Sequence, residues 1–407
     1  MRIAFVVQRY GLEVTGGAEF LCRLLAEHLS KYWTIEVFTT CAIDYMSWRN
    51  EYPEGKGEVN GITVWRFPVD NPRDIKAFDQ LTQKIYGSEH TKEEEERWMA
   101  LQGPCSSSLQ QALEARASEY DFFIFVTYLY AHTYYGLRRV KEKALLIPLG
   151  HDEPPLYLSI FDELFLLPKA IIYSTPEEAD LVWKRFNNHH IPSETIGVGV
   201  DPPKDFNGQR FRSKYSLEEE FIIYVGRVDK SKGCQEIVYY FLRYQRETNS
   251  PLKLVLIGNA IMPIPQHPNI IYLGQLSEED KFDALQAAAA AVMPSPYESF
   301  SILLLESWLT RTPVIVNGKC AVLKGQCLRS NGGLFYYSYD EFRIVLERLL
   351  RDKRLGEQLA INGEGYVKEN YSWPIIEKKY QAFLDEIARA ERALITPQLK
   401  EAERSYP

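Results

Sequence analysis

Two cations stand at one predicted turn in the second half of the sequence. Arg227 comes shortly after the apolar segment FIIYV (221–225), and Lys232 follows five residues later, where a helix is expected to begin. The planar guanidinium and the compact ammonium group both suit a diphosphate. The alternative is that both side chains are simply solvated at the surface, as Arg and Lys usually are.

Two carboxylates enclose an almost wholly apolar run in PYESFSILLLES (296–307). Ser299 or Ser301 is a suitable cap for a helix that continues past Glu306, so Glu298 precedes the helix. Eight helical residues separate the two acids by at most about 12 Å. That is the scale of a nucleotide sugar, with one acid for sugar hydroxyls, the other for a ribose, and the helix N-terminus for phosphate. Alternatively, Glu306 forms an ion pair with a neighbouring helix.

The elements that position these groups alternate short apolar segments with helical patterns, which predicts parallel sheets covered by helices. Strands are expected over residues 2–7, 34–40, 62–67, 121–127, 144–150 and 170–175, and again over 221–227, 253–258, 269–274, 290–295 and 313–318. The charged segment 71–118 is predicted to be a helical excursion, with KEEEER (92–97) as a solvated face.

Gly, Pro and Asn-Gly in IGVGVDPPKDFNG (196–208) mark a domain boundary. The predicted fold class is therefore α/β, with two Rossmann-like doubly wound domains and a ligand cleft between them. Residues 1–203 form the first domain, with a terminal helix (380–407) crossing back onto it, and residues 204–379 form the second.

The first strand-to-helix turn contains Gly16 and Gly17, where a ligand anion could approach backbone N–H groups. A plain flexible turn is an equally good interpretation. The turn has no G-x-G-x-x-G pattern, which disfavours a nicotinamide or flavin dehydrogenase.

Composition limits the remaining classes. The formal net charge of −8 gives no support to nucleic-acid binding, and no apolar run approaches the roughly 20 residues of a membrane span. The six cysteines are scattered without zinc spacing, which indicates reduced thiols. A cytoplasmic protein is predicted, at most peripheral to the inner face of the plasma membrane.

Taken together and in order, these segments resemble the retaining glycosyltransferases of family 4, which have the GT-B fold. The resemblance covers nearly the whole chain. The matching segments are TGGAE (15–19), GVD (199–201), GRVDKSKG (226–233), LIGN (256–259), YLGQLSEED (272–280), MPSPYESFSILLLES (293–307) and YSW (371–373). The family usually has Gly where this chain has Ser299 and Ser301. The serine side chains narrow the pocket and restrict φ, so this departure concerns the fit of the sugar more than the class of reaction.

The resemblance implies a role for each matching position. Arg227 and Lys232 would neutralise the diphosphate. Glu298 would hold the donor sugar and Glu306 the ribose. The implied donor-binding residues are Gly16, Gly17, Arg227, Lys232, Gln275, Leu276, Glu298, Ser299, Phe300, Ser301, Ile302 and Glu306. No metal is expected to be required.

Loops of the first domain supply further candidates. His151 lies just beyond a predicted strand, and relatives often have a His there that touches the donor sugar near the reacting carbon. Asp152 is a weaker candidate for an acceptor contact, as are Tyr128 and His132. Nearby tyrosines could line a platform for an acceptor sugar, although core packing explains some of them equally well.

The resemblance implies a retaining enzyme that moves a sugar, with a hexose and a UDP donor favoured, to a hydroxyl of a glycan or lipid-linked acceptor in polysaccharide biosynthesis. Two alternatives stay open. One is a nucleotide-sugar epimerase with a similar fold, and the other is a non-catalytic sensor of nucleotide sugars.

Overall fold

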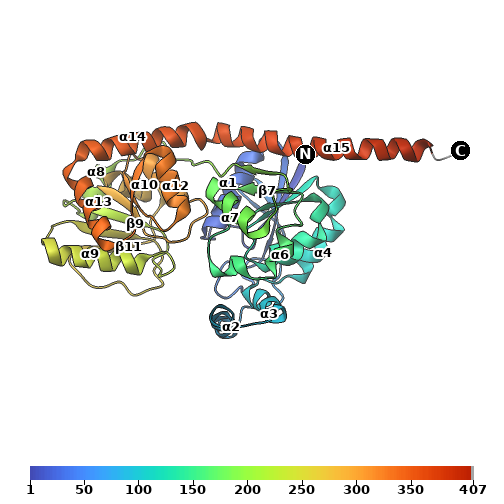
Figure 1. Ribbon diagram of the computed structural model, residues 1–407, viewed down its shortest axis with the longest axis horizontal. Helices are drawn as coiled ribbons and strands as arrows, with labels where there is room; N and C mark the ends of the chain where they lie inside the picture. The colour runs from blue at the N-terminus through green and yellow to red at the C-terminus, as the bar shows by residue number, and fades with distance from the viewer. Residues whose placement is uncertain (405–407) are drawn as a thin grey trace. The chain divides into compact units, whose positions relative to one another are not determined.

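The computed structural model describes the backbone of residues 1–404 and the side-chain surroundings of residues 1–390. The chain divides into two compact units (Figure 1). Unit 1 comprises residues 1–198 and 374–407, and unit 2 comprises residues 199–373. These limits lie within a few residues of the boundaries that the sequence predicts.

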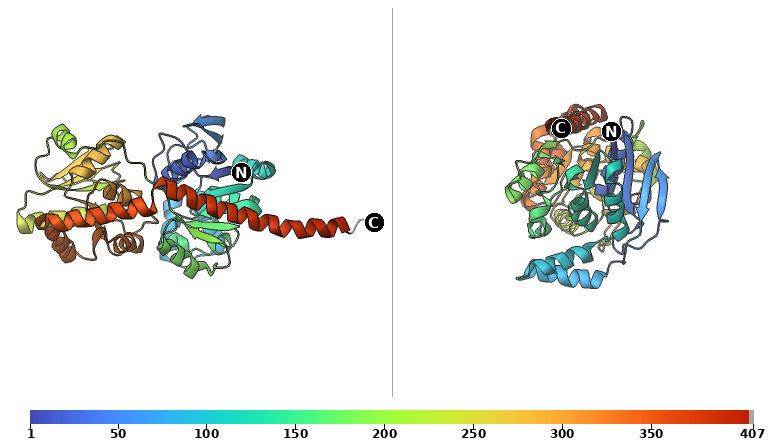
Figure 2. Two further views of the ribbon diagram at one scale, coloured as in Figure 1. Left: turned by 90° about the horizontal axis from the view of Figure 1, so that it is seen from above. Right: turned by 90° about the vertical axis from the view of Figure 1, so that its right-hand side faces the viewer.

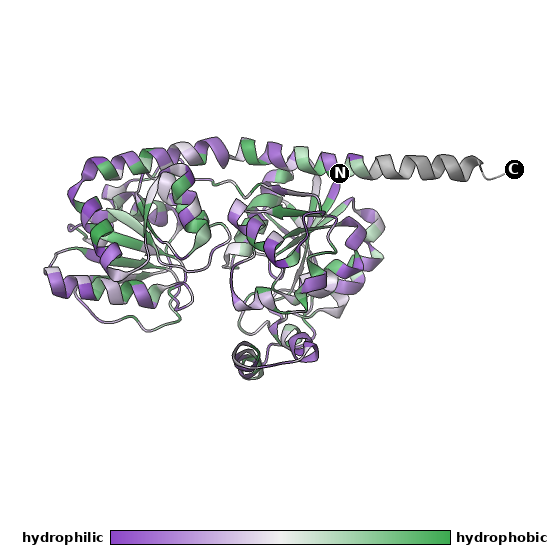
Figure 3. Cartoon of the chain, in the orientation of Figure 1, coloured by the Kyte–Doolittle hydropathy of each residue, from purple (hydrophilic) through white to green (hydrophobic). Residues whose placement is uncertain are grey.

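Unit 1 contains an eight-stranded sheet in the order β3-β4-β2-β1-β5-β6-β7-β8. Neighbouring strands run parallel except β3 and β4, which are antiparallel. The strands are β1 (Arg2–Val6), β2 (Thr34–Thr40), β3 (Gly55–Val59), β4 (Ile62–Phe67), β5 (Phe122–Val126), β6 (Ala144–Ile147), β7 (Ala170–Tyr173) and β8 (Ser193–Thr195). The central strands are continuous apolar runs because helices cover both faces of a parallel sheet. Figure 3 shows the strands as largely hydrophobic and the surrounding helices as more hydrophilic.

The helices of unit 1 include the predicted excursion. They are α1 (Gly17–Leu29), α2 (Ile75–Gly87), α3 (Lys92–Gln102), α4 (Ser107–Ala115), α5 (Ala131–Arg139), α6 (Phe161–Leu164) and α7 (Pro176–Phe186), with short 3-10 turns η1 (Ala117–Glu119), η2 (Lys141–Lys143) and η3 (Pro154–Tyr157). Helices α2 and α3 lie side by side and protrude from the unit (Figures 1 and 2).

The acidic run at the start of α3 is only partly solvated, which corrects one prediction. Glu95 is 4% exposed. Its carboxylate accepts hydrogen bonds from Ser159 Oγ (2.7 Å) and Ile160 N (2.9 Å) and pairs with His90 Nε2 (2.9 Å). Glu95 therefore ties the excursion to the segment before α6.

Unit 2 contains a six-stranded parallel sheet in the order β11-β10-β9-β12-β13-β14. Its strands are β9 (Phe221–Val225), β10 (Lys253–Ile257), β11 (Ile270–Gly274), β12 (Ala290–Met293), β13 (Val314–Asn317) and β14 (Gly333–Tyr336). Its helices are α8 (Gly208–Tyr215), α9 (Cys234–Thr248), α10 (Glu278–Ala287), α11 (Ile302–Leu309), α12 (Ala321–Ser330), α13 (Tyr339–Arg351) and α14 (Lys353–Asn370).

The terminal helix α15 (Trp373–Arg404) begins at the unit boundary, and its residues from Pro374 onward belong to unit 1. Buried Glu377 accepts hydrogen bonds from Lys31 Nζ (2.9 Å) and Tyr32 OH (2.7 Å). These bonds fix the start of α15 beside the end of α1. Part of the predicted helix 380–407, residues 405–407, lies outside the described residues. Within the described part of the chain, no helix combines the length and apolarity that crossing a bilayer requires.

Helix α11, which carries Glu306, packs tightly against α14. Trp308 is fully buried, and its indole Nε1 donates to Gly332 O (2.8 Å). A Cβ atom on Gly363 would lie 2.2 Å from Trp308 Cδ1, whereas a Cβ on Gly365 would meet nothing within 4 Å. Only the first glycine is therefore required by packing.

The two glycines of α14 provide a matched test. We expect Gly363→Ala to lower the free energy of unfolding by about 1–3 kcal/mol, because the added methyl group overpacks the contact with Trp308. Gly365→Ala should raise it by about 0.5–1 kcal/mol, because alanine loses less conformational entropy in a helix. Urea denaturation of both variants measures the difference. Equal effects would contradict the packing of α11 on α14.

Candidate functional site

The predicted cation turn lies at the carboxyl end of β9. Arg227 follows Gly226, and its Nε pairs with Asp229 Oδ2 at 2.9 Å. Lys232 immediately precedes Gly233, the residue before α9, which adopts a left-handed conformation with φ of 73°. A Cβ atom on Gly233 would lie 2.2 Å from the carbonyl oxygen of Pro294. Glycine at this position thus lets the turn after β9 approach the loop after β12.

The approach of these two turns joins a predicted cation to a predicted carboxylate. Lys232 Nζ donates to Glu298 Oε1 at 2.9 Å. The side chain of Lys232 is 33% exposed and that of Glu298 is 20% exposed. An ion pair this accessible to water stabilises the fold by no more than about 1 kcal/mol. The pair orients both groups while leaving them able to take a new partner.

The loop between β12 and α11 has an unusual backbone. Ser299 and Phe300 are buried, and Ser301 adopts a left-handed conformation with φ of 69° and ψ of 83°. Ser301 is the residue before the helix, which confirms one of the two predicted cap positions, but its side chain makes no capping hydrogen bond. Left-handed backbone favours glycine. Ser301 therefore occupies a position where the backbone itself explains the glycine of the family pattern.

Glu306 lies inside α11 and is 5% exposed. It forms an ion pair with Lys281 Nζ of α10 at 2.7 Å, and Lys281 also pairs with Glu278. Burial raises the pKa of Glu306. Burial opposes the charge of Lys281, but the neighbouring carboxylates of Glu306 and Glu278 raise the pKa of this lysine. The ion-pair alternative is thus realised in the structure, and a ribose contact by Glu306 stays a prediction.

The sheet order explains which predicted residues of unit 2 come together. Strands β9 and β12 are neighbours, so the turn containing Arg227 and Lys232 adjoins the loop of Glu298. Gln275 and Leu276 follow β11, which is separated from β9 by β10, and they precede α10. All of these groups follow the carboxyl ends of parallel strands, the edge where such sheets bind ligands.

In unit 1, the glycine turn is held by a buried network that the sequence analysis missed. Gly16 and Gly17 are exposed, and a Cβ on Gly16 would clash with Glu19 Oε2. The carboxylate of Glu19 accepts from Gln8 Nε2 (2.9 Å) and Arg9 Nε (2.8 Å). Polar residues directly after a buried strand were the available signal for this network.

A second buried acid anchors the loop of His151. Glu178 is fully buried and accepts from Gly150 N and Ser174 N, both at 2.6 Å. Burial raises the pKa of Glu178 to about 7. His151 itself is partly exposed and faces Glu153, with 3.2 Å between Nδ1 and Oε1. The first turn of α7, rich in glutamate, was the sequence signal for this anchor.

Two of the three predicted acceptor contacts are wrong. Tyr128 is 1% exposed and packs against Phe161 and Phe165. His132 is 2% exposed because it lies on the inner face of α5. Asp152 is exposed and accepts a hydrogen bond from Tyr157 OH (2.6 Å).

Among the residues that the structure describes, no group of three or more His, Cys, Asp and Glu side chains is placed to hold a metal ion.

Comparison with known proteins defines the class. Residues 205–366, nearly all of unit 2, match the family model of glycosyl transferases group 1. An uncharacterized glycosyltransferase, MJ1607 of Methanocaldococcus jannaschii, is 24% identical over 412 residues, covering 93% of this chain and 96% of the relative. The capsular polysaccharide biosynthesis glycosyltransferase CapM of Staphylococcus aureus is 26% identical over 200 residues, covering 44% and 51%.

The solved structures agree on the fold. Anabaena Alr3699/HepE, crystallised in complex with UDP-glucose, superposes with a TM-score of 0.69 over 95% of this chain and all of its own, at 14% identity. The chain thus has the GT-B fold. Unit 2 is its group 1 glycosyl transferase domain.

The burial of His132 predicts a specific pH dependence. Burial lowers the pKa of His132 to about 3. Its Nε2 lies 3.0 Å from Val126 O, whereas Nδ1 has no hydrogen-bond partner among the described residues. Below pH 6.5 the unfolded chain therefore binds a proton that the folded protein does not, and stability falls as pH falls.

We expect His132→Gln to have a lower free energy of unfolding than wild type at pH 7.5. The difference between the two proteins should shrink by roughly 2–3 kcal/mol at pH 4.5, because only wild type loses stability through this histidine as the pH falls. Urea denaturation at several pH values measures this. His190→Gln, at an exposed position, is the control and should follow wild type throughout. A constant gap would contradict a neutral, buried His132.

Proposed function

We propose that this protein transfers a sugar from a nucleoside diphosphate donor to a hydroxyl of a glycan or lipid-linked acceptor, with retention of anomeric configuration. UDP is the favoured nucleotide and a hexose the favoured sugar. The observation that carries the proposal is the meeting of Lys232 and Glu298 beside Arg227 at adjoining strand ends. This arrangement supplies fixed cations and a fixed carboxylate at the ligand-binding edge of unit 2.

The cations would neutralise the diphosphate. Each is already oriented by a carboxylate, Arg227 by Asp229 and Lys232 by Glu298. Such preorganised charges stabilise developing negative charge without reorganising during the reaction. We propose that the transfer therefore needs no metal ion. The sugar–phosphate bond would break as the acceptor oxygen bonds to the anomeric carbon, with the acceptor proton passing to the leaving phosphate.

The remaining donor contacts follow from position. Glu298 precedes α11 and would accept hydrogen bonds from sugar hydroxyls, while the backbone of Ser299 to Ile302 would meet phosphate. Glu306 would hold the ribose, and Gln275 with Leu276 would contact the base. On unit 1, the roles of Gly16, Gly17 and His151 toward the donor stay predictions.

The names of similar proteins support the donor and the setting. Anabaena Alr3699/HepE was crystallised with UDP-glucose, and CapM serves capsular polysaccharide biosynthesis. We therefore propose a role in polysaccharide biosynthesis. The six cysteines form no disulfide, which supports a cytoplasmic location.

Substitutions at Arg227 and Lys232 test whether these two cations act as a clamp on the diphosphate. We expect Arg227→Ala and Lys232→Ala each to slow UDP release from UDP-glucose by about 10²–10³-fold, the usual effect of losing one preorganised donor. Lys230→Ala is the matched control, because Lys230 is exposed in the same turn, and it should retain wild-type activity. Full activity in both site variants would remove the clamp from the mechanism. Abolition by EDTA with recovery on adding Mg²⁺ would contradict the metal-free proposal.

The two acids should fail differently. Glu298→Gln should leave the affinity for UDP near wild type but reduce transfer, because UDP lacks the sugar that Glu298 contacts. Glu306→Gln should weaken UDP and UDP-glucose alike. Calorimetry with both ligands gives the four affinities. Glu278→Gln, which removes the other carboxylate beside Lys281, controls for the lost charge. Equal weakening of UDP by both site variants would refute this division of roles.

A further inference from the structure

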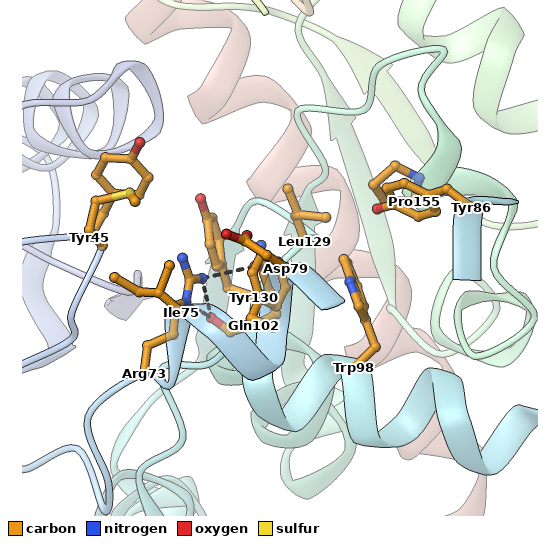
Figure 4. A pocket seen from close by; sticks show the side chains of 12 residues that line it. Tyr45, Arg73, Ile75, Asp79, Tyr86, Trp98, Gln102, Leu129, Tyr130 and Pro155 are labelled. Carbon is orange, nitrogen blue, oxygen red and sulfur yellow. Dashed lines mark hydrogen bonds between the residues drawn. The ribbon is translucent and has the colours of Figure 1, made fainter. Parts of the chain in front are cut away.

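A pocket of about 330 Å³ lies in unit 1 beside the protruding helices α2 and α3 (Figure 4). Its walls come from the loop after β2, from α2 and α3, from the segment between β5 and α5, and from η3. Three of these segments follow the carboxyl ends of parallel strands, where α/β sheets bind ligands. The volume is at the small end of the range of about 300–1,000 Å³ for small-molecule sites, so the pocket fits one small ring better than an extended chain.

Five of the twelve residues that line the pocket are aromatic. Phe78, Tyr86, Trp98 and Tyr130 are among them. Tyr86 and Met46, which both line the pocket, are each 40% exposed. Large apolar side chains left open to water at a concave site are typical of a binding surface.

Two charged groups face the same space. The guanidinium of Arg73 lies 4.9 Å from the ring centre of Trp48 and 4.7 Å from that of Phe78. Its Nε donates to Gln102 O (3.1 Å) and its Nη2 to Gln102 Oε1 (2.8 Å), which fixes its plane. Asp79 follows on α2 and also lines the pocket. The site thus presents a fixed charged donor and a charged acceptor among aromatic faces.

We propose that this pocket binds a pyranose ring of the acceptor. A sugar ring has an apolar face of C–H groups, which packs against aromatic rings, and hydroxyls that form charge-assisted hydrogen bonds with Arg73 and Asp79. A purely apolar ligand would cover these charged groups without replacing their water, which is unfavourable. The polar groups therefore favour a saccharide.

The pocket also adjoins the loop of His151, the residue predicted to touch the donor sugar. Pro155, which lines the pocket, lies four residues after His151 in η3. This inference rests on the proposed function only in assigning the sugar as an acceptor. Binding of a sugar to the pocket is measurable without any donor.

The test is binding of simple glycosides to the full chain. The probes are the methyl glycosides of glucose, galactose, mannose, rhamnose and N-acetylglucosamine, with hexan-1-ol as the apolar probe. Saturation-transfer NMR and tryptophan fluorescence, to which Trp98 contributes, report binding. We expect at least one glycoside to bind, and Asp79→Asn and Tyr86→Ala to weaken it by about tenfold or more.

Matched controls separate the pocket from general effects. Asp180→Asn and Tyr239→Ala change exposed helical residues outside the pocket and should bind the glycoside as wild type does. Asp180→Asn and Tyr239→Ala should also release UDP from UDP-glucose, with water as acceptor, at the wild-type rate. If wild type does not release UDP from UDP-glucose, the proposed function is contradicted, but the assignment of the pocket as a sugar site is not.

Three outcomes would overturn the pocket assignment. No glycoside binds, or hexan-1-ol binds while every glycoside fails, or the glycoside binds equally well to Asp79→Asn and Tyr86→Ala. None of these results would contradict the proposed sugar transfer, so failure of the pocket assignment is distinguishable from failure of the proposed function.

Discussion

The close approach of Gly233 to the carbonyl oxygen of Pro294 sets the geometry of the candidate site in unit 2. A side chain on residue 233 would push the turn after β9 away from the loop after β12. Lys232 would then lose Glu298, since their ion pair spans these two segments. The absence of one methyl group therefore determines whether cation and carboxylate share a site. The strands behind them are ordinary, and their parallel order places both segments at the same edge.

The sequence predicted those parts of the fold in which the pattern and the environment agree. The buried strands β1, β5, β9 and β10 are continuous apolar runs, and each was predicted near its observed limits. Strands β3 (GKGEV) and β8 (SET) were missed because edge strands with one open side need few apolar residues. Strand β14 was also missed; it is an edge strand of the unit 2 sheet, and only Tyr336 of its residues is buried.

The site was predictable in composition but not in pairing. Charge at a strand end marked Arg227, Lys232 and Glu298, since the carboxyl ends of parallel strands meet. Which acid pairs with which lysine depends on tertiary approach, so Glu306 with Lys281 could only be stated as an alternative. His132 was misplaced because sequence does not give the rotation of a short helix about its axis. Tyr128 was misplaced because it lies in the loop between β5 and α5, where no periodic pattern shows which side chains turn into the core. Arg73 and Asp79 belong to a charged segment whose pattern predicted helices and nothing more.

Glu178 has a consequence for motion. One carboxylate accepts from Gly150, in the loop after β6, and from Ser174, directly after β7. Neither backbone segment can leave its place without stranding a buried carboxylate or an amide, so the two should open together as one cooperative unit. The buried carboxylate of Glu178 therefore anchors the start of the loop of His151 at Gly150. The amide hydrogens of Gly150 and Ser174 should therefore exchange with solvent at a common rate, set by the same opening event.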